Sequence, residues 1–231
     1  MIMNIERVAS MTIKSSFAIT AGRFSYWYLH TFMKGGSSLP GKIATKFDPA
    51  VLKQLTKNYD VIIITGTNGK TLTTALTVQT LKQKYDHIMT NSSGSNMMQG
   101  LTTAFLADHP QKRQRQLAVL EVDEANVEPL CHYIKPKAIV MTNIFRDQMD
   151  RFGEIYTTYN MILAGVKLVP EATLIMNADL PLFSSVELPN PKIYYGFNHL
   201  PDGEMMAPSN TDGVLCPVCD HIIHYKFISY A

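Results

Sequence analysis

Residues 61–71 have the sequence Val-Ile-Ile-Ile-Thr-Gly-Thr-Asn-Gly-Lys-Thr, and this stretch decides the fold of the chain. The run Val61–Ile64 predicts a buried strand, and a helical pattern follows Thr71. A glycine-containing turn between a strand and a helix points backbone N–H groups and the positive end of the helix at phosphate. We therefore interpret residues 65–71 as a P-loop.

The loop pattern also predicts individual roles. Lys70 is expected to reach the β- and γ-phosphates of a nucleotide, and the Thr71 hydroxyl to ligate Mg²⁺. The other loop residues expected to bind the nucleotide are Gly66, Thr67, Asn68 and Gly69. The usual spacing has one more glycine, at the position of Ile64, so the short string alone also fits a loop with an accidental Gly-Lys-Thr.

More short apolar runs follow, separated by helical stretches. They are residues 117–120, 138–141, 174–176 and 193–195. This alternation predicts βαβ units and an α/β fold, with a mainly parallel sheet covered by helices on both faces. Ligands of such sheets bind beyond the carboxyl ends of the strands, so the polar residues after each run are the candidates for a site.

Carboxylates stand at the end of the second run. Glu121 ends this run, and Asp123 and Glu124 follow closely. One hydroxyl and one carboxylate, completed by phosphate and water, form a usual Mg²⁺ site, so Glu121 is expected to share the metal with Thr71. Asp123 or Glu124 could be the ligand instead, or all three could be a solvated strand end.

Thr142-Asn143 follows the third run and leads into Arg-Asp-Gln-Met-Asp-Arg-Phe-Gly-Glu at residues 146–154. Here the sequence resembles the Mur ligase superfamily, whose central domain has a Gly-Thr-x-Gly-Lys-Thr/Ser loop, a strand-ending glutamate and a Thr-Asn-x-x-x-Asp-His-x-Asp block. It most closely resembles the ligase-like subunits of lipid II isoglutaminyl synthases. The further motifs that carry this resemblance are residues 91–97 and Cys-Pro-Val-Cys at 216–219, and it extends from about Leu39 to the last residue.

The resemblance implies roles for further residues. It implies that Lys70 and Glu121 serve catalysis and that Asn143 belongs to the nucleotide site. Asn177-Ala178-Asp179 is similar to the superfamily's Asn-x-Asp-Asp, which is associated with adenine, although Leu180 replaces the second aspartate. Asn177 and Asp179 are therefore expected at the nucleotide, while the alternative is an ordinary strand-ending turn, in which Asn and Asp are common.

The chain also departs from the wider superfamily. Gln148 stands where most members have a metal-binding histidine, and residues 161–163 occupy the stretch where many have a carbamylated lysine. A second metal site is therefore not expected. Both departures resemble the isoglutaminyl synthase subunits and argue against a conventional amino-acid-adding ligase.

Cys216 and Cys219 have the spacing of one knuckle of a zinc ribbon, and structural zinc needs four ligands. In the resembling proteins a second cysteine pair follows downstream. Here His221 and His224 could complete the site, although four ligands would crowd into nine residues. We expect instead a chain truncated within the ribbon that holds half of a structural zinc site. Cys131, with His132 in an apolar stretch, is expected to be structural.

The chain divides into three predicted parts: an N-terminal helical segment (1–55), an ATP-binding central domain (56–200) and the start of a zinc-ribbon insertion (201–231). In the first part, Phe17, Ala21, Phe24, Tyr28 and Phe32 have helical spacing. Such an aromatic stripe lies in the core, contacts a partner or rests on a membrane surface. Asp48-Pro49 predicts the N-cap and first residue of a short helix through Leu55.

Composition limits the class of protein. Of 231 residues 46% are hydrophobic, and 21 Lys and Arg nearly balance 19 Asp and Glu, which excludes a disordered, an acidic or a strongly basic nucleic-acid-binding chain. No nucleic-acid partner is expected. Three cysteines favour a reducing compartment, and Arg7, Lys14 and Arg23 interrupt the apolar N-terminal stretch, so we expect a cytoplasmic protein, with the inner membrane face as an alternative.

The resemblance also implies a function for the protein as a whole. It implies ATP-dependent activation of the D-glutamate α-carboxyl of lipid II as an acyl phosphate, and amidation by ammonia from a class I glutamine amidotransferase of the GatD type. A truncated chain is expected to bind nucleotide and to turn over poorly alone. The alternatives are an amino-acid-adding ligase of the Mur or folylpolyglutamate type, and a noncatalytic nucleotide-binding module.

Overall fold

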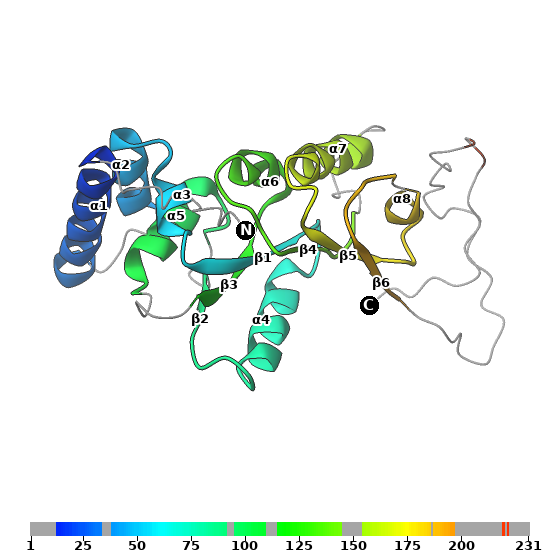
Figure 1. Ribbon diagram of the computed structural model, residues 1–231, viewed down its shortest axis with the longest axis horizontal. Coiled ribbons are helices and arrows are strands. Elements are labelled where there is room, and N and C mark those ends of the chain that lie inside the picture. The colour runs from blue at the N-terminus through cyan, green and yellow to red at the C-terminus, as the bar shows by residue number, and fades with distance from the viewer. Residues whose placement is uncertain are drawn as a thin grey trace, which may run out of the picture.

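The structure is a computed structural model that describes residues 13–33, 38–91, 95–109, 115–144, 154–185, 187–196, 219 and 221. Helices and strands alternate along most of this part of the chain (Figure 1). In order they are α1 (Ile13–Phe32), α2 (Leu39–Phe47), α3 (Val51–Leu55), β1 (Tyr59–Thr65), α4 (Lys70–Leu81), β2 (Ile88–Thr90), α5 (Met98–Ala107), β3 (Gln116–Glu121), α6 (Glu124–Cys131), β4 (Ala138–Met141), α7 (Glu154–Lys167), β5 (Thr173–Asn177), α8 (Pro181–Ser184) and β6 (Lys192–Tyr195).

The strands form one parallel sheet in the order β2-β3-β1-β4-β5-β6. After β1 the chain runs to one side through β2 and back to β3, and it then crosses to the other side of β1 with β4. The carboxyl end of β1 therefore lies at a topological switch point, where parallel α/β sheets bind their ligands.

Helices cover both faces of the sheet, as predicted (Figure 1). In β1, Val61 and Ile63 belong to the large core that includes residues of α6 and α7. Ile62 and Ile64 point the other way, toward Val78 of α4. This alternation, with apolar residues on both faces, is why the strands are continuous apolar runs. The predicted α/β fold class is confirmed.

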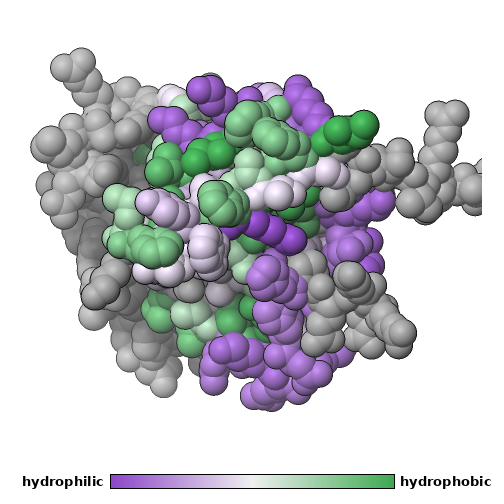
Figure 2. Space-filling model, turned by 90° about the vertical axis from the view of Figure 1, so that its left-hand side faces the viewer, coloured by the Kyte–Doolittle hydropathy of each residue, from purple (hydrophilic) through white to green (hydrophobic). Residues whose placement is uncertain are grey.

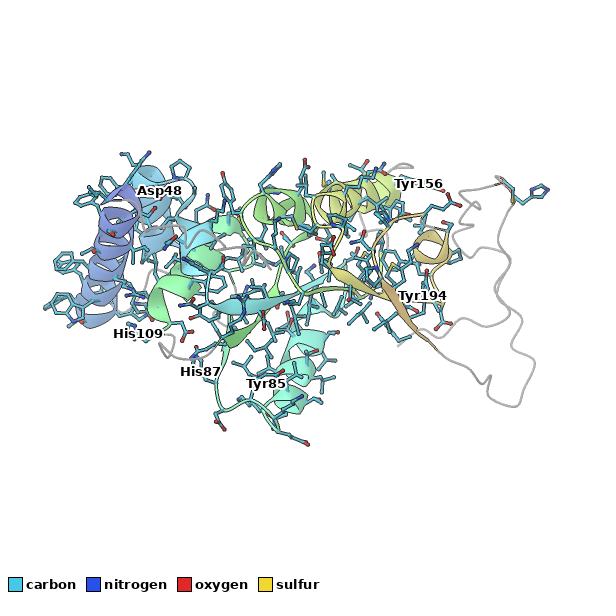
Figure 3. All side chains as sticks on the ribbon, in the orientation of Figure 1. Asp48, Tyr85, His87, His109, Tyr156 and Tyr194 are labelled. Atoms are coloured by element: carbon cyan, nitrogen blue, oxygen red, sulfur yellow. The ribbon has the colours of Figure 1, made fainter. Side chains whose placement is uncertain are left out.

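The N-terminal helices pack together beyond α5. Ala18 of α1, Ala44 of α2, Val51 of α3 and Leu106 of α5 form a small core of their own. Asp48 follows α2, is 7% exposed and accepts a 2.6 Å hydrogen bond from the Ser15 hydroxyl (Figure 3). Three helices thus occupy most of the described residues between 13 and 55, and they contact the α/β part through α5.

Two local predictions were wrong. The short helix begins at Val51 with Ala50 as its N-cap, and Asp48 is instead the C-cap of α2, where its backbone N–H donates to the Ala44 carbonyl. The Asp48 carboxylate accepts the Ala50 N–H at 3.0 Å, before the short helix begins. Of the three placements predicted for the aromatic stripe, the core is also wrong. Phe17, Phe24, Tyr28 and Phe32 are 47–64% exposed, and the buried face of α1 consists of Leu29 and three small residues.

Candidate functional site

The loop between β1 and α4 has the backbone form that a phosphate site requires. Gly66 has φ +128° and Gly69 has φ +77°, both in the region that favours glycine. Gly69 is the N-cap residue of α4, so the helix begins at Lys70 with its first N–H groups directed out of the sheet edge. The predicted loop residues are thus at the positive end of a helix twelve residues long.

Residues after β4 hold this loop in shape. The Asn143 side chain accepts a hydrogen bond from the Asn68 N–H (2.9 Å) and donates one to the Asn68 carbonyl (3.0 Å). The Thr67 N–H donates to the Asn143 carbonyl at 2.8 Å, and the Thr142 hydroxyl donates to the Asn68 carbonyl at 2.9 Å. Asn143 therefore lies at the predicted site, with its amide directed at the loop backbone.

Lys70 is folded over the loop. Its Nζ donates to the carbonyls of Gly66 (2.6 Å) and Thr67 (3.1 Å), and it lies 3.5 Å from Glu124 Oε1 and 3.8 Å from Asp123 Oδ1. Its side chain is only 13% exposed. The ammonium group is thus held by two backbone carbonyls of the loop, with the carboxylates of Asp123 and Glu124 near enough to balance its charge.

Thr71 and Glu121 meet across the sheet edge. The Thr71 hydroxyl donates to Glu121 Oε1 at 3.1 Å. Asn91, which sequence reasoning did not place in the site, fixes the backbone of Glu121: its amide donates to the Glu121 carbonyl at 2.8 Å, and the Glu121 N–H donates to its Oδ1 at 2.9 Å. Asn91 follows β2, and the three residues of this strand are too short a run to predict a strand from the sequence. Of the three candidate carboxylates, Glu121 is the one beside Thr71.

Glu124, which the sequence left open as an alternative metal ligand, lies near Lys70 of the loop. Burial raises its pKa above the ordinary value, and the nearby Lys70 only partly offsets this rise. The folded protein therefore holds the Glu124 proton more tightly than the unfolded chain does, so ionisation of Glu124 lowers the free energy of unfolding as the pH rises.

We predict that Glu124→Gln gains stability relative to wild type as the pH rises from about 4.5 through the folded pKa. Below that range the two proteins should differ least, because both then carry a neutral side chain at this position. Thermal unfolding between pH 4.5 and 8 measures the difference, with the exposed Glu128→Gln on the same helix as control. A stability difference that moves in the opposite direction would contradict the pKa rise.

Asn177 and Asp179 follow β5, one strand further from the loop than β4. The Asn177 Oδ1 accepts the Asp179 N–H at 2.9 Å, which is a strand-ending Asx turn. The Tyr195 hydroxyl donates to the carbonyls of Met141 (3.0 Å) and Thr142 (3.1 Å), so the end of β6 is tied to the end of β4. All these residues lie at the carboxyl edge of the sheet, with β4 between β5 and the P-loop strand.

The remaining predictions concern metals and cysteines. Cys219 is exposed and free, and Cys216, His224 and Gln148 lie outside the described residues. Within the described ranges no three His, Cys, Asp or Glu side chains gather in a way that could hold a metal ion. Cys131 is buried, and burial raises its pKa to about 12, as expected for a structural thiol.

Comparison with known proteins gives the family. The model of the Mur ligase middle domain matches residues 64–210, which is more than half of the chain. The chain therefore belongs to the Mur ligase middle-domain family, as its motifs predicted.

Within that family, particular relatives are similar over nearly the whole chain. The chain is 50% identical over 221 residues to the lipid II isoglutaminyl synthase (glutamine-hydrolyzing) subunit MurT of Streptococcus pneumoniae, which covers 96% of this chain and 49% of that protein. It is 38% identical over 205 residues to MurT of Staphylococcus aureus, covering 85% of this chain and 45% of that protein. The chain thus spans about half the length of these relatives.

Solved structures support the fold alone. MurF ligase from Thermotoga maritima in complex with ADP matches with a TM-score of 0.57 at 21% identity, over 66% of this chain and 36% of that one. The UDP-N-acetylmuramoylalanyl-D-glutamyl-2,6-diaminopimelate–D-alanyl-D-alanyl ligase from Acinetobacter baumannii matches with a TM-score of 0.52 at 16% identity, over 66% of this chain and 34% of that one. The chain therefore shares its α/β fold with these two ligases over the part that they match.

Proposed function

We propose that this chain binds the phosphates of ATP at residues 66–71 and that ATP serves to activate a carboxylate for amide formation. The single observation that carries the proposal is the meeting of Lys70, Thr71 and Glu121 at the carboxyl edge of β1 and β3. A triphosphate needs a concentration of donors and positive charge, and a metal needs hard oxygen ligands. This edge offers both.

Phosphate binding follows from the loop geometry. The N–H groups at the start of α4 and the Lys70 ammonium are charge-complementary to phosphate oxygens. Lys70 has to leave the Gly66 and Thr67 carbonyls to reach a phosphate, and the charge-assisted bonds that it gains there replace those it loses. Asn143 and Thr142 keep the loop open in the form that accepts the nucleotide.

The residues present also fit Mg²⁺. Thr71 Oγ1 and Glu121 Oε1 lie 3.1 Å apart, and both are hard oxygen donors of the kind that Mg²⁺ takes alongside phosphate and water. When bound, the ion would neutralise charge between the phosphates as the transferred phosphoryl group develops negative charge. The chain's own part is to hold the hydroxyl and the carboxylate together, which the Asn91 bonds to the Glu121 backbone secure.

The substrate and partner are inferred from the relatives. Lipid II isoglutaminyl synthesis converts the α-carboxyl of D-glutamate in the stem peptide to an amide. The carboxylate oxygen attacks the γ-phosphorus and releases ADP; ammonia then attacks the acyl phosphate carbon, and inorganic phosphate leaves with a proton released. Ammonia comes from hydrolysis of glutamine by a separate class I glutamine amidotransferase. The similarity to MurT supports this choice, because its name gives both the product and the glutamine hydrolysis.

We predict that Thr71→Val and Glu121→Gln each raise the Mg²⁺ concentration needed for ATP binding by about tenfold or more, because each removes one oxygen ligand. Calorimetric titration of ATP at several Mg²⁺ concentrations measures the shift. Thr73→Val, one turn into α4 and outside the pair, is the matched control. Equal Mg²⁺ dependence in all three variants would show that the metal is held elsewhere.

The direct test of the reaction uses a complex that contains this chain and the glutaminase. We expect ADP and amidated lipid II to form together when ATP, lipid II and glutamine are present, and ammonia to replace glutamine. Mass spectrometry of the lipid and assay of ADP measure both products. Ligation of an added amino acid in place of ammonia would instead make this a conventional ligase and contradict the proposal.

A further inference from the structure

The outer face of α1 is strongly apolar. Four of its aromatic residues are more than half exposed: Phe17 (58%), Phe24 (63%), Trp27 (54%) and Phe32 (64%). Tyr28 is 47% exposed. None of the described helices combines the length and the hydropathy that a bilayer crossing requires. Figure 2 looks onto this end of the molecule and shows apolar and weakly polar residues in the middle of the face, with hydrophilic ones above and below.

The aromatic rings form one continuous group, defined here as the α1 platform: Phe24, Trp27, Tyr28 and Phe32. The ring centroids of Phe24 and Trp27 lie 5.7 Å apart, those of Trp27 and Phe32 lie 6.0 Å apart, and those of Tyr28 and Phe32 lie 5.1 Å apart. These contacts place large apolar side chains together before any partner arrives.

Packing fixes this platform outward. The buried face of α1 consists of Ser15, Ala18, Gly22 and Leu29. A Cβ at Gly22 would lie 2.7 Å from Leu106 of α5 and 3.0 Å from Ala44 of α2, so the backbone approaches its neighbours too closely for a larger residue. Rotation of α1 to bury its aromatic residues would remove this close packing. The aromatic rings are therefore exposed because the opposite face of α1 packs closely against α2 and α5.

The charged side chains on α1 and α2 have one sign. Residues 13–47 contain five Lys and Arg and no Asp or Glu, although acidic residues nearly equal basic ones in the whole chain. On α1, Lys14 and Arg23 are exposed, and on the adjacent α2, Lys42 and Lys46 are exposed. Asp48, the first carboxylate after α2, is buried against Ser15. The described residues of α1 and α2 thus carry the aromatic platform and exposed cations, and no exposed carboxylate.

We propose that the α1 platform and the lysines of α2 dock onto an anionic lipid bilayer, with α1 lying in the plane of the interface. Phe, Trp and Tyr side chains favour the boundary between headgroups and acyl chains, and Lys and Arg are attracted to anionic headgroups. A second copy fits less well, because a symmetric pairing would bring the same cations face to face. The biological use of this contact, access to a lipid-linked substrate, rests on the function proposed above.

Trp27 makes the test direct, because it is the only tryptophan of the chain. The full 231-residue chain is mixed with vesicles of phosphatidylcholine containing phosphatidylglycerol, and with vesicles of phosphatidylcholine alone. We expect a blue shift of the Trp27 emission and quenching by brominated acyl chains with anionic vesicles only. Raising the salt to about 1 M should weaken the binding, because screening then acts within about 3 Å.

Two pairs of variants separate the apolar and the charged contributions. Phe24→Ser with Trp27→Ser, and Lys42→Glu with Lys46→Glu, should each lower the vesicle partition coefficient by about tenfold or more in flotation assays. Leu76→Ser with Tyr85→Ser, and Lys82→Glu with Lys84→Glu, are the matched controls on and after α4. Tyr85 lies well away from α1 (Figure 3), and both control pairs should bind like wild type.

The outcomes are distinct. Binding that fails with anionic vesicles, or that survives both α1 and α2 variants, would overturn the proposal. Loss of a dimer in Phe24→Ser with Trp27→Ser, without vesicle binding by wild type, would assign the face to a second copy and equally overturn it. The vesicles contain neither ATP nor lipid II, so this result is independent of the nucleotide titrations that test the proposed function.

Discussion

Replacing Lys70 by alanine is expected to weaken ATP binding by about 10- to 100-fold, since one charge-assisted hydrogen bond to phosphate contributes about 1.5–3 kcal/mol. The loss of amidation rate should be larger, about 10²- to 10³-fold, because the ammonium also stabilises the charge that develops during phosphoryl transfer. Calorimetry with a nonhydrolysable ATP analogue measures the first quantity, and ADP release by the complex with the glutaminase measures the second.

Lys82→Ala is the matched control for Lys70→Ala. Lys82 is the C-cap residue of the same helix, α4, at the end opposite the loop. The Lys82→Ala substitution should leave ATP affinity unchanged, and thermal unfolding of both variants shows whether each is folded. ATP affinity that Lys70→Ala does not reduce would count against the loop as the phosphate site, whatever the activity of the complex.

Gly66→Ala is expected to destabilise the protein by about 3 kcal/mol and to abolish measurable ATP binding. The cause is twofold. Gly66 has φ +128°, where side chains are rarely found, and a Cβ would lie 2.3 Å from Thr142 Oγ1 and 2.6 Å from the Asn143 carbonyl oxygen. The new methyl group would push away the two residues that hold the loop in shape.

Gly69 offers a comparison for this effect. It also has positive φ, +77°, but a Cβ there would meet nothing nearer than Thr73 Oγ1 at 4.0 Å. Asparagine tolerates this left-handed conformation, so Gly69→Asn should cost about 1 kcal/mol or less and remain folded. Chemical denaturation of both variants measures the contrast. Equal losses at the two positions would show that the contacts of Gly66 with Thr142 and Asn143 are unimportant.

The parts of the fold that were predictable are those in which local sequence and burial agree. Residues 138–141 coincide with β4, and residues 61–64 lie within β1, because a strand buried on both faces needs apolar residues at every position. The P-loop was recognisable because its glycines are demanded by backbone conformation rather than by distant contacts. That Thr71 and Glu121 lie close together was also predictable, since neighbouring parallel strands end at the same edge of a sheet.

Other features depended on tertiary packing. β2 has only three residues, and its partner β3 supplies the pairing that its own sequence does not predict. α2 was not predicted as a separate helix within the N-terminal helical segment, and it has Pro40 in its first turn, where proline is tolerated.

Side-chain direction was the least predictable property. The aromatic stripe of α1 has the spacing of a buried face, but the close approach of Gly22 to Leu106 and Ala44 puts the small residues inside. The role of Asn143 at the nucleotide stays a prediction, but the sequence did not reveal that its amide bonds both the N–H and the carbonyl of Asn68. In both cases a neighbouring backbone, which the sequence does not reveal, decides which partner a side chain meets.

The most direct measurement is a crystal structure of the chain with a nonhydrolysable ATP analogue and Mg²⁺. We expect the β- and γ-phosphates to lie against the N–H groups of residues 67–71 with Lys70 Nζ on their oxygens, and Thr71 and Glu121 to hold the metal directly or through water. A triphosphate bound away from this loop, or a Lys70 that stays on the Gly66 carbonyl with nucleotide present, would contradict this expectation.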